Sequence, residues 1–272
     1  MDRVLPYKLD TARSWWQRAM TLGKQLRSER FDLVVVSNPV KEFHVGIWAA
    51  GIPCRVGYHQ KWGWALTHRL PKRQVLGERH EVEYNLDLVR RLGLPTHVPT
   101  WQWKGFEKEQ DEVSQLLGQQ GVQSSESFMA VHPWTSNPSK QWPLERYRAL
   151  IQRVVEHLPV RVVVVGGTEV NGQPHAVLPT GMPVVNLTGR TSLTQLAALL
   201  QRAKLLVSND SGPVHLAAAL GTRCVVLFGT SDPATGPRRW GPWGMGHEVI
   251  HRPTMDAITV DEVMEAVYRV WR

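Results

Sequence analysis

Cysteine and long apolar runs are scarce in this sequence. Only two of the 272 residues are cysteines, and Cys54 and Cys224 lie in apolar stretches without a Cys-x-x-Cys spacing. This pattern argues against a disulfide framework and against a cysteine metal site. Apolar runs such as Val162–Val165 are far shorter than the roughly 20 residues that cross a bilayer. Residues 1–6 lack the apolar core of a signal peptide, so we expect a cytoplasmic protein.

Clustered positive charge is also missing, although the chain is basic. The formal net charge is +8 and the pI is near 9.8, yet the densest basic runs are only pairs, as in Lys72-Arg73 and Arg238-Arg239. No basic stripe is interleaved with stacking aromatic residues, which argues against a nucleic-acid partner. Scattered positive charge is equally suited to anionic lipid headgroups or to a phosphorylated substrate.

Tryptophan, by contrast, is abundant. The chain has twelve tryptophans, and many of them come in pairs. Most are expected in the core or at its rim, because tryptophan is largely buried on average. A role in binding an acceptor or a membrane interface stays open as the alternative for some of them. The pairs are Trp15-Trp16, Trp62/Trp64, Trp101/Trp103 and Trp240/Trp243.

The second half of the chain alternates strand-like and helix-like segments. Ser192 and Gln195 have the spacing of a capping box at the start of a helix. Such alternation predicts an α/β fold with a parallel, doubly wound sheet. The expected strands are 128–132, 161–167, 184–187, 205–207 and 224–229, and the expected helices are 144–158, 192–203 and 260–271.

The first half repeats this pattern less clearly. Helices are expected near 11–27, 41–50 and 78–91, with strands at 31–36 and just before Tyr58. Residues 94–127 are polar and contain prolines, so we place the domain boundary there. The predicted organisation is a first lobe at 1–120, a second lobe at 121–258 and a C-terminal helix at 259–272. Two Rossmann-like lobes would face a cleft and bind ligand at the carboxyl ends of their strands.

The segment Ser208–Gly221 holds the most informative pattern. It runs from a strand through a polar turn, Asp210-Ser211-Gly212, into a short helix opened by Pro213. Proline suits the first turn of a helix, and glycine lets a ligand approach the backbone. The free N–H groups of such a helix start can bind phosphate. Alternatively, Asp210 or Ser211 simply caps the helix.

Three further signals follow strands in the second half. His132–Pro143 combines hydroxyl groups with Lys140 just before a helix, which suits a phosphate clamp. Gly166–Glu169 places a carboxylate after a strand, where it could bind ribose hydroxyls. Phe228–Pro233 begins a long loop rich in glycine and proline. Each signal alone is weak, since Lys140 and Glu169 could be ordinary surface residues.

Four short motifs, in this order, resemble those of glycosyltransferase family 9, which includes the ADP-heptose:lipopolysaccharide heptosyltransferases. The resemblance covers essentially the whole chain and is strongest from Ala130 to Thr230. The motifs are Ser139–Pro143, Asn186–Gly189 with Ser192-Leu193, Asn209–Gly212 with His215–Ala219, and the strand end Leu227–Gly229.

The resemblance implies a GT-B fold and an inverting, metal-independent sugar transfer. The donor would be a nucleotide-diphosphate sugar carrying a heptose-like group, and the acceptor a lipopolysaccharide or another cell-surface glycan. No Asp-x-Asp occurs in the chain, as expected for transfer without a metal. No cofactor is expected, because the nucleotide sugar is a substrate. A lipid-linked acceptor would place the protein at the inner face of the inner membrane, against anionic lipid.

The resemblance also implies roles for individual residues. Lys140 would stabilise the charge that grows on the leaving diphosphate, and Glu169 would contact the ribose. His215 would line the phosphate site, although an imidazole there could also be a core group. The full set of implied donor-binding residues is Thr135, Ser136, Lys140, Glu169, Asp210, Ser211, Gly212 and His215.

The sequence departs from the family pattern at its start. Family members begin with a strand and a glycine-rich turn bearing an aspartate, which resembles the general base for the acceptor hydroxyl. This sequence begins after that region, with roughly 60 residues missing by the usual length of βαβ units. We therefore assign no general base and expect an incomplete first lobe. Trp134 also stands where the family has a small residue.

Two explanations of the short start lead to different functions. With a misassigned start codon, which we favour, the true protein is longer and transfers sugar. With a real shortened form, the chain binds nucleotide sugar and transfers it poorly or not at all. A third class, another two-lobed nucleotide-sugar enzyme such as an epimerase, fits the motifs less well.

Overall fold

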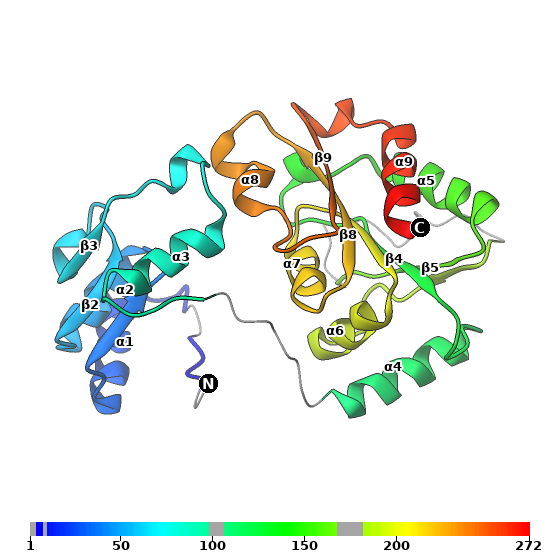
Figure 1. Cartoon of the computed structure of the whole chain (residues 1–272). Helices are drawn as coiled ribbons and strands as arrows, with labels where there is room; N and C mark the ends of the chain where they lie inside the picture. The colour runs from blue at the N-terminus through cyan, green and yellow to red at the C-terminus, as the bar shows by residue number, and fades with distance from the viewer. Residues whose placement is uncertain (1–3, 8–9, 98–105, 168–181) are drawn as a thin grey trace. The chain divides into compact units, whose positions relative to one another are not determined.

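The computed structural model describes residues 4–7, 10–97, 106–167 and 182–272, and the chain divides into two compact units. The first unit is Met1–Val98 and the second is Pro99–Arg272. Each unit contains a parallel sheet with helices packed against it (Figure 1). The predicted α/β class with doubly wound, Rossmann-like lobes is confirmed.

The sheet of the second unit has six parallel strands in the order β6-β5-β4-β7-β8-β9. From β4 the chain moves outward to β5 and β6, and β7 then returns to the other side of β4. The strand order therefore reverses between β4 and β7, which is the point where open α/β sheets bind their ligands. The strands are β4 (Phe128–His132), β5 (Arg161–Val164), β6 (Val184–Asn186), β7 (Leu205–Asn209), β8 (Arg223–Gly229) and β9 (Glu248–Arg252).

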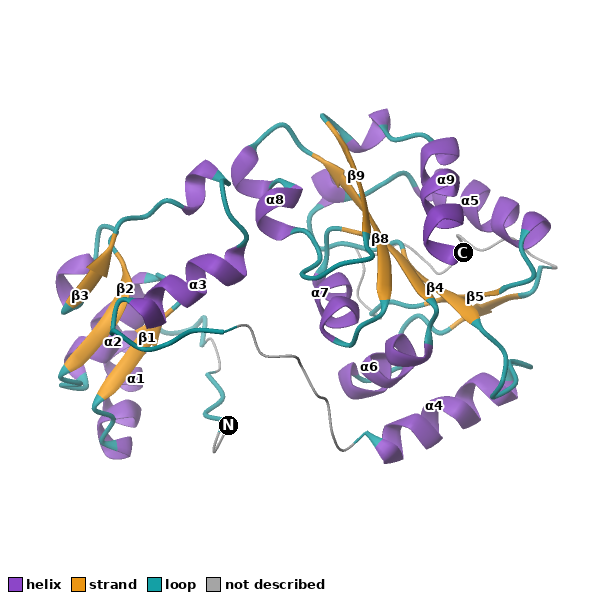
Figure 2. Ribbon diagram, viewed as in Figure 1, coloured by secondary structure: helices purple, strands orange, loops and turns teal. Residues whose placement is uncertain are grey.

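Helices cover both faces of this sheet (Figure 2). On one face, α5 (Leu144–His157) and α9 (Val260–Trp271) share a core with Val225 and Leu227 of β8. On the other face, α4 (Glu107–Gln119), α6 (Leu193–Arg202) and α7 (Gly212–Ala219) pack with Cys224 and Val226. The alternation along β8 follows from the two-residue period of a strand. The short α8 (Pro237–Trp240) lies in the connection from β8 to β9.

The first unit holds a smaller sheet of three parallel strands in the described residues, in the order β1-β2-β3. Its strands are β1 (Leu33–Val36), β2 (Cys54–Tyr58) and β3 (His68–Leu70), and its helices are α1 (Trp15–Glu29), α2 (Lys41–Ala49) and α3 (Glu81–Arg90). Helices α1 and α2 pack closely because both carry glycine at the contact. A Cβ on Gly23 would lie 3.0 Å from the carbonyl oxygen of Gly46.

The division of the chain differs from the predicted boundaries. Along the sequence, the boundary between the two units falls between Val98 and Pro99 rather than at residue 120. The reason is α4, whose Val113 and Leu117 are buried in the same core as α6. The predicted C-terminal helix is α9 and packs in the core of the second unit instead of standing apart.

None of the helices in the described parts of the chain is both long enough and apolar enough to pass through a membrane.

Candidate functional site

A cavity of about 570 Å³ opens where β4 and β7 end. Its walls come from the loop after β4 and from the turn that leads from β7 into α7. It therefore lies at the carboxyl ends of the two strands between which the strand order reverses, and its volume is typical of a small-molecule site. The lining residues are His132, Trp134, Thr135, Ser136, Asn137, Lys140, Asp210, Ser211, Gly212, Pro213 and His215.

The start of α7 faces this cavity without a side-chain cap. Ser211 occupies the N-cap position, but its hydroxyl makes no capping hydrogen bond. Within the described residues, no acceptor is recorded for the backbone N–H groups of Ser211 and Gly212. A Cβ built on Gly212 would meet no atom within 4 Å. These donors and the positive end of the helix dipole are thus open to an anion, and the capping interpretation is wrong.

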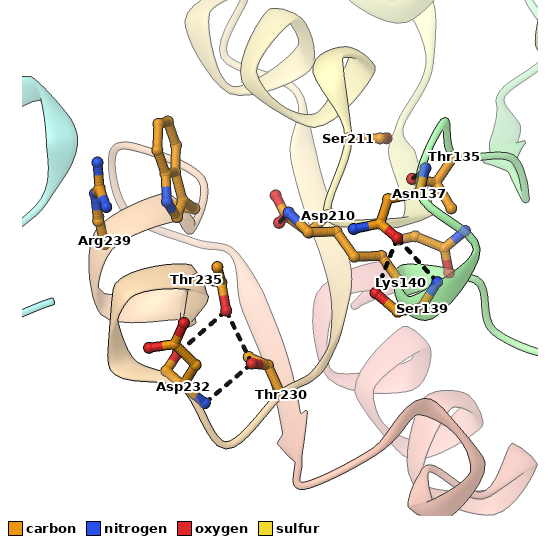
Figure 3. Close-up of polar contacts among 12 residues, drawn as sticks. Thr135, Asn137, Ser139, Lys140, Asp210, Ser211, Thr230, Asp232, Thr235 and Arg239 are labelled. Atoms are coloured by element: carbon orange, nitrogen blue, oxygen red, sulfur yellow. Dashed lines mark hydrogen bonds and ion pairs between the residues drawn. The ribbon is translucent and has the colours of Figure 1, made fainter. Parts of the chain in front are cut away.

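The Asp210 carboxylate instead forms an ion pair with the ammonium group of Lys140 (Figure 3). The Asp210 side chain is 8% exposed and the Lys140 side chain 33% exposed, so the pair stands at the inner edge of the cavity. Lys140 ends a single turn of 3₁₀ helix, Pro138–Lys140, which begins with an Asn137 cap on the N–H of Ser139 at 3.1 Å. Lys140 is therefore a positioned cation rather than an ordinary surface residue.

Asn209 ties the two cavity walls together. Its amide nitrogen donates to the carbonyl of Pro133 at 2.9 Å, and its amide oxygen accepts from the N–H of Trp142 at 3.1 Å and from the Tyr147 hydroxyl at 3.0 Å. The Asn209 side chain is fully buried. Because one amide holds the β4 loop, the segment after Lys140 and helix α5, the position of the lysine depends on it.

A second buried cluster explains why Ser211 does not cap its helix. The Ser211 hydroxyl lies 3.0 Å from the Ser208 hydroxyl and 3.2 Å from Nδ1 of His132, and Ser208 in turn lies 3.2 Å from the same nitrogen. Burial lowers the pKa of His132 to about 4. The ring is therefore neutral at physiological pH, and its Nδ1 can accept a hydrogen bond from either hydroxyl.

Trp134 closes one side of the cavity. Its side chain is buried, and a Cβ on Gly166 would fall 2.2 Å from its Cδ1 atom. Any larger residue at position 166 would therefore displace the indole. The large residue at 134 is therefore accommodated beside Gly166, the glycine that follows β5.

The loop after β8, the third sequence signal, forms a separate closed turn (Figure 3). The Thr230 and Thr235 hydroxyls lie 2.9 Å apart, and the Thr230 hydroxyl accepts from the N–H of Asp232 at 3.1 Å. The Asp232 carboxylate caps the following turn at Ala234, at 2.9 Å. These hydroxyl and carboxylate groups form hydrogen bonds within the loop, and their residues are not among those that line the cavity.

The structure brings together seven of the eight sequence-predicted site residues. Thr135, Ser136, Lys140, Asp210, Ser211, Gly212 and His215 all line the cavity. His215 is exposed on its wall, so the core-group interpretation is wrong. Glu169 lies outside the described residues. The donor-binding roles of all eight remain predictions.

Sequence reasoning missed several residues of the site. His132, Asn137 and Pro213 line the cavity, and Asn209 holds its walls. Each stood inside a motif already singled out, but nothing in the local pattern distinguishes a buried organising amide from a turn residue. In the parts of the chain that the structure describes, no group of three or more His, Cys, Asp or Glu side chains is arranged to hold a metal ion.

Comparison with known proteins identifies relatives over nearly the whole chain. The model of "Glycosyltransferase family 9 (heptosyltransferase)" matches residues 19–265. Lipopolysaccharide heptosyltransferase 2 of Escherichia coli K12 is 29% identical over 79% of the chain and 65% of its own length. Lipopolysaccharide core heptosyltransferase OpsX of Haemophilus influenzae is 24% identical over 85% of the chain and 65% of its own length.

A solved structure gives the same fold. The family 9 glycosyl transferase from Veillonella parvula superimposes with a TM-score of 0.81 at 18% identity, covering 95% of this chain and 80% of that one. The chain thus spans 65% of the length of these two curated relatives and 80% of the solved relative.

Proposed function

Since the chain belongs to glycosyltransferase family 9, we propose that it transfers a heptose-like sugar from a nucleotide-diphosphate sugar to a lipopolysaccharide or other cell-surface glycan. The names of its relatives, lipopolysaccharide heptosyltransferases among them, support this choice of substrates. We include in the proposal that the transfer inverts the anomeric centre and needs no metal ion.

The observation that carries the proposal is the uncapped start of α7 beside Lys140. A leaving nucleoside diphosphate develops negative charge on its terminal phosphate as the glycosidic bond breaks. The open N–H groups of Ser211 and Gly212 and the ammonium of Lys140 are cationic or dipolar groups fixed before the reaction. Preorganised groups of this kind stabilise charge that develops in a transition state. They could take the part that a divalent cation plays in other sugar transfers.

Asp210 has a positioning role in this proposal. Its carboxylate holds the Lys140 ammonium at the cavity edge, and the ammonium has further N–H donors to offer a phosphate. The Thr135 and Ser136 side chains and His215 complete the wall around the diphosphate. We assign the ribose to Glu169 on the strength of the family resemblance alone.

No residue of this chain is assigned as the general base. The alternative function is therefore that of a weakly active or non-catalytic nucleotide-sugar-binding protein of the same family. In either case we place the protein in the cytoplasm, at the inner face of the inner membrane.

Two measurements test the proposal. Calorimetric titration with ADP, UDP, GDP and ADP-heptose identifies the nucleotide, and we expect binding to one diphosphate at micromolar strength or better. A coupled assay then measures nucleoside diphosphate released in the presence of lipopolysaccharide acceptor, with and without EDTA. Release that EDTA does not affect supports metal-independent transfer. Binding without release supports the alternative, and absence of binding to every nucleotide contradicts both.

A further inference from the structure

The first unit carries a continuous cluster of five tryptophans, which we call the tryptophan patch. Its members come from three elements: Trp15 and Trp16 open α1, Trp48 lies near the end of α2, and Trp62 and Trp64 belong to the segment after β2. The rings form an unbroken series. Trp16 contacts Trp15 at 5.5 Å between ring centroids, Trp15 contacts Trp62 at 5.2 Å, Trp62 contacts Trp64 at 6.4 Å, and Trp64 contacts Trp48 at 5.3 Å.

The patch lies at the surface of the unit rather than in its core. Trp16, Trp48 and Trp64 are each 47% exposed, and the two intervening rings are only partly buried. The core of this side of the sheet is formed by other residues, among them Val36, Ile47 and Leu66. Contiguous exposed apolar side chains of this size mark a surface that contacts something else.

One lysine lies over a ring of the patch, and a second is next to the patch in the chain. The Lys41 ammonium lies 4.8 Å from the centroid of the Trp15 ring, and exposed Lys61 directly precedes Trp62. Neither lysine has a recorded ion pair with any residue the structure describes. The nearby carboxylates are already neutralised, since Glu42 pairs with Arg18 at 2.6 Å and Asp10 with Arg13 at 2.9 Å. The surface around the rings is therefore apolar with a positive rim.

Half-exposed indole rings with adjacent lysines are suited to the headgroup region of an anionic bilayer. Indole rings concentrate at the headgroup level of bilayers, where the apolar body is buried and the N–H stays hydrated. Lysines beside them are attracted to anionic headgroups. We propose that the tryptophan patch docks the protein onto an anionic bilayer. The choice of a bilayer as the partner rests on the proposed function, because an acceptor built on a lipid lies at a bilayer surface. The location of the patch is observed independently of that function.

Docking through the patch is peripheral and needs no segment that crosses the bilayer. Partial insertion of several rings gives reversible binding, in which apolar burial and charge attraction act together. Such binding weakens as salt screens the lysines, while the contribution of the rings remains.

Vesicle sedimentation with the full chain tests the proposal. The vesicles contain phosphatidylethanolamine and phosphatidylglycerol at roughly three to one, or phosphatidylcholine alone as the neutral comparison. We expect the wild-type protein to sediment with the anionic vesicles. The triple variant Trp16→Gln, Trp48→Gln and Trp64→Gln should bind at least about tenfold more weakly. The pair Lys41→Gln and Lys61→Gln should lose about tenfold at low salt and little at high salt.

Matched variants control for general loss of apolar surface or charge. Leu193 and Met245 are exposed apolar residues of the second unit, at 75% and 95%, and their change to Gln should leave vesicle binding within about twofold. Lys24→Gln and Lys108→Gln remove the same charge elsewhere. Melting temperatures show whether the triple variant is folded, and the single variant Trp64→Gln repeats the test if it is not.

Four outcomes would overturn the proposal. In the first two, the wild-type protein does not bind anionic vesicles, or the triple variant binds them as well as the wild type does. In the third, the triple variant loses only the binding of lipid-free acceptor oligosaccharide. In the fourth, sedimentation velocity shows that the patch joins two copies of the chain. Nucleotide titration of the same variants keeps this test separate from the proposed function. Vesicle binding without any nucleotide binding refutes the proposed transfer and leaves the docking surface standing.

Discussion

At the scale of single residues, the Lys140–Asp210 pair is the sharpest test of the site. Replacing Lys140 by Met should weaken nucleoside diphosphate binding by about 2 kcal/mol, or roughly thirtyfold, because a charged hydrogen bond is lost. The single change also leaves Asp210 nearly buried without its cation, which lowers stability. The double variant Lys140→Met with Asp210→Asn removes that second effect.

We therefore expect the double variant to recover the melting temperature but not the affinity. Calorimetric titration and thermal unfolding measure the two properties separately. Lys108→Met, an exposed lysine on α4, is the matched control and should leave binding unchanged. Recovery of affinity in the double variant would show that Lys140 does not contact the ligand.

Gly212 offers a steric test of the same site. A Cβ at this position meets no atom within 4 Å, so Gly212→Ala should leave the free energy of unfolding within about 0.5 kcal/mol. If a phosphate sits against the open N–H groups, the added methyl should weaken binding about tenfold. Gly118→Ala on α4, also open within 4 Å, is the control. Unchanged affinity in Gly212→Ala would place the ligand away from the α7 start.

His132 links the site to stability at low pH. Burial lowers its pKa to about 4, against about 6.5 in an unfolded chain. Below pH 6.5 the unfolded chain takes up a proton that the folded chain excludes, so the free energy of unfolding falls as pH drops toward 4. At pH 5 this proton uptake lowers the free energy of unfolding by about 2 kcal/mol relative to neutral pH.

Urea unfolding at pH 7.5 and pH 5 measures the effect. His132→Gln should reduce the loss of stability between the two pH values by about 2 kcal/mol relative to wild type. Burial also lowers the pKa of His44 and of His247, so a pH dependence of the same sign persists in the variant. Equal losses in both proteins would contradict the assignment to His132.

At the scale of elements, one amide joins three segments. Asn209 hydrogen-bonds the β4 loop, the N–H of Trp142 and the Tyr147 hydroxyl of α5. Asn209→Ala leaves those buried groups unsatisfied and should lower the free energy of unfolding by about 3 kcal/mol. Because the same change releases the loop that carries Lys140, nucleotide affinity should fall as well. Gln152→Ala, on the exposed face of α5, should change neither in the same urea and titration experiments.

The elements themselves were largely predictable. β-branched runs such as Arg161–Val164, and the capping box at Ser192 and Gln195, have local signatures that the structure confirms. By contrast, β3 and β9 escaped prediction because His68–Leu70 and Glu248–Arg252 contain charged residues and show neither a β-branched run nor a regular alternation. Helix α4 escaped because its sequence is mostly polar, with Val113 and Leu117 alone fully buried.

The sequence predicted most of the residues that line the site, but not the ion pair and hydrogen bonds between them. Local sequence placed Lys140 and Asp210 in separate loops, and their pairing depends on β4 lying beside β7. The same holds for Ser211, whose hydroxyl is diverted by His132 and Ser208 rather than used as a cap. Long-range pairings of this kind follow from strand order, which no local pattern reveals.

At the scale of the whole molecule, the two units have separate cores. Val36, Ile47 and Leu66 belong to a cluster of the first unit, while Val131 and Val207 belong to one of the second. Calorimetric unfolding of the full chain should therefore resolve two transitions. A saturating nucleoside diphosphate should move only one transition to a higher temperature. At a hundred times its dissociation constant, the ligand should raise the free energy of unfolding of that unit by about 2.7 kcal/mol. A single transition, or an equal shift of both, would show that the units unfold together.

The uncapped start of α7 also limits which stabilising substitutions this protein can accept. A helix whose N-cap side chain is engaged elsewhere forgoes about 1 kcal/mol that a capping group would supply. Selection for heat resistance alone would favour substitutions around Ser208 and His132 that free Ser211 to cap the helix. Each such gain would occupy the donors that an anion needs. Thermostable variants should therefore accumulate at this turn only in lineages that no longer use the cavity.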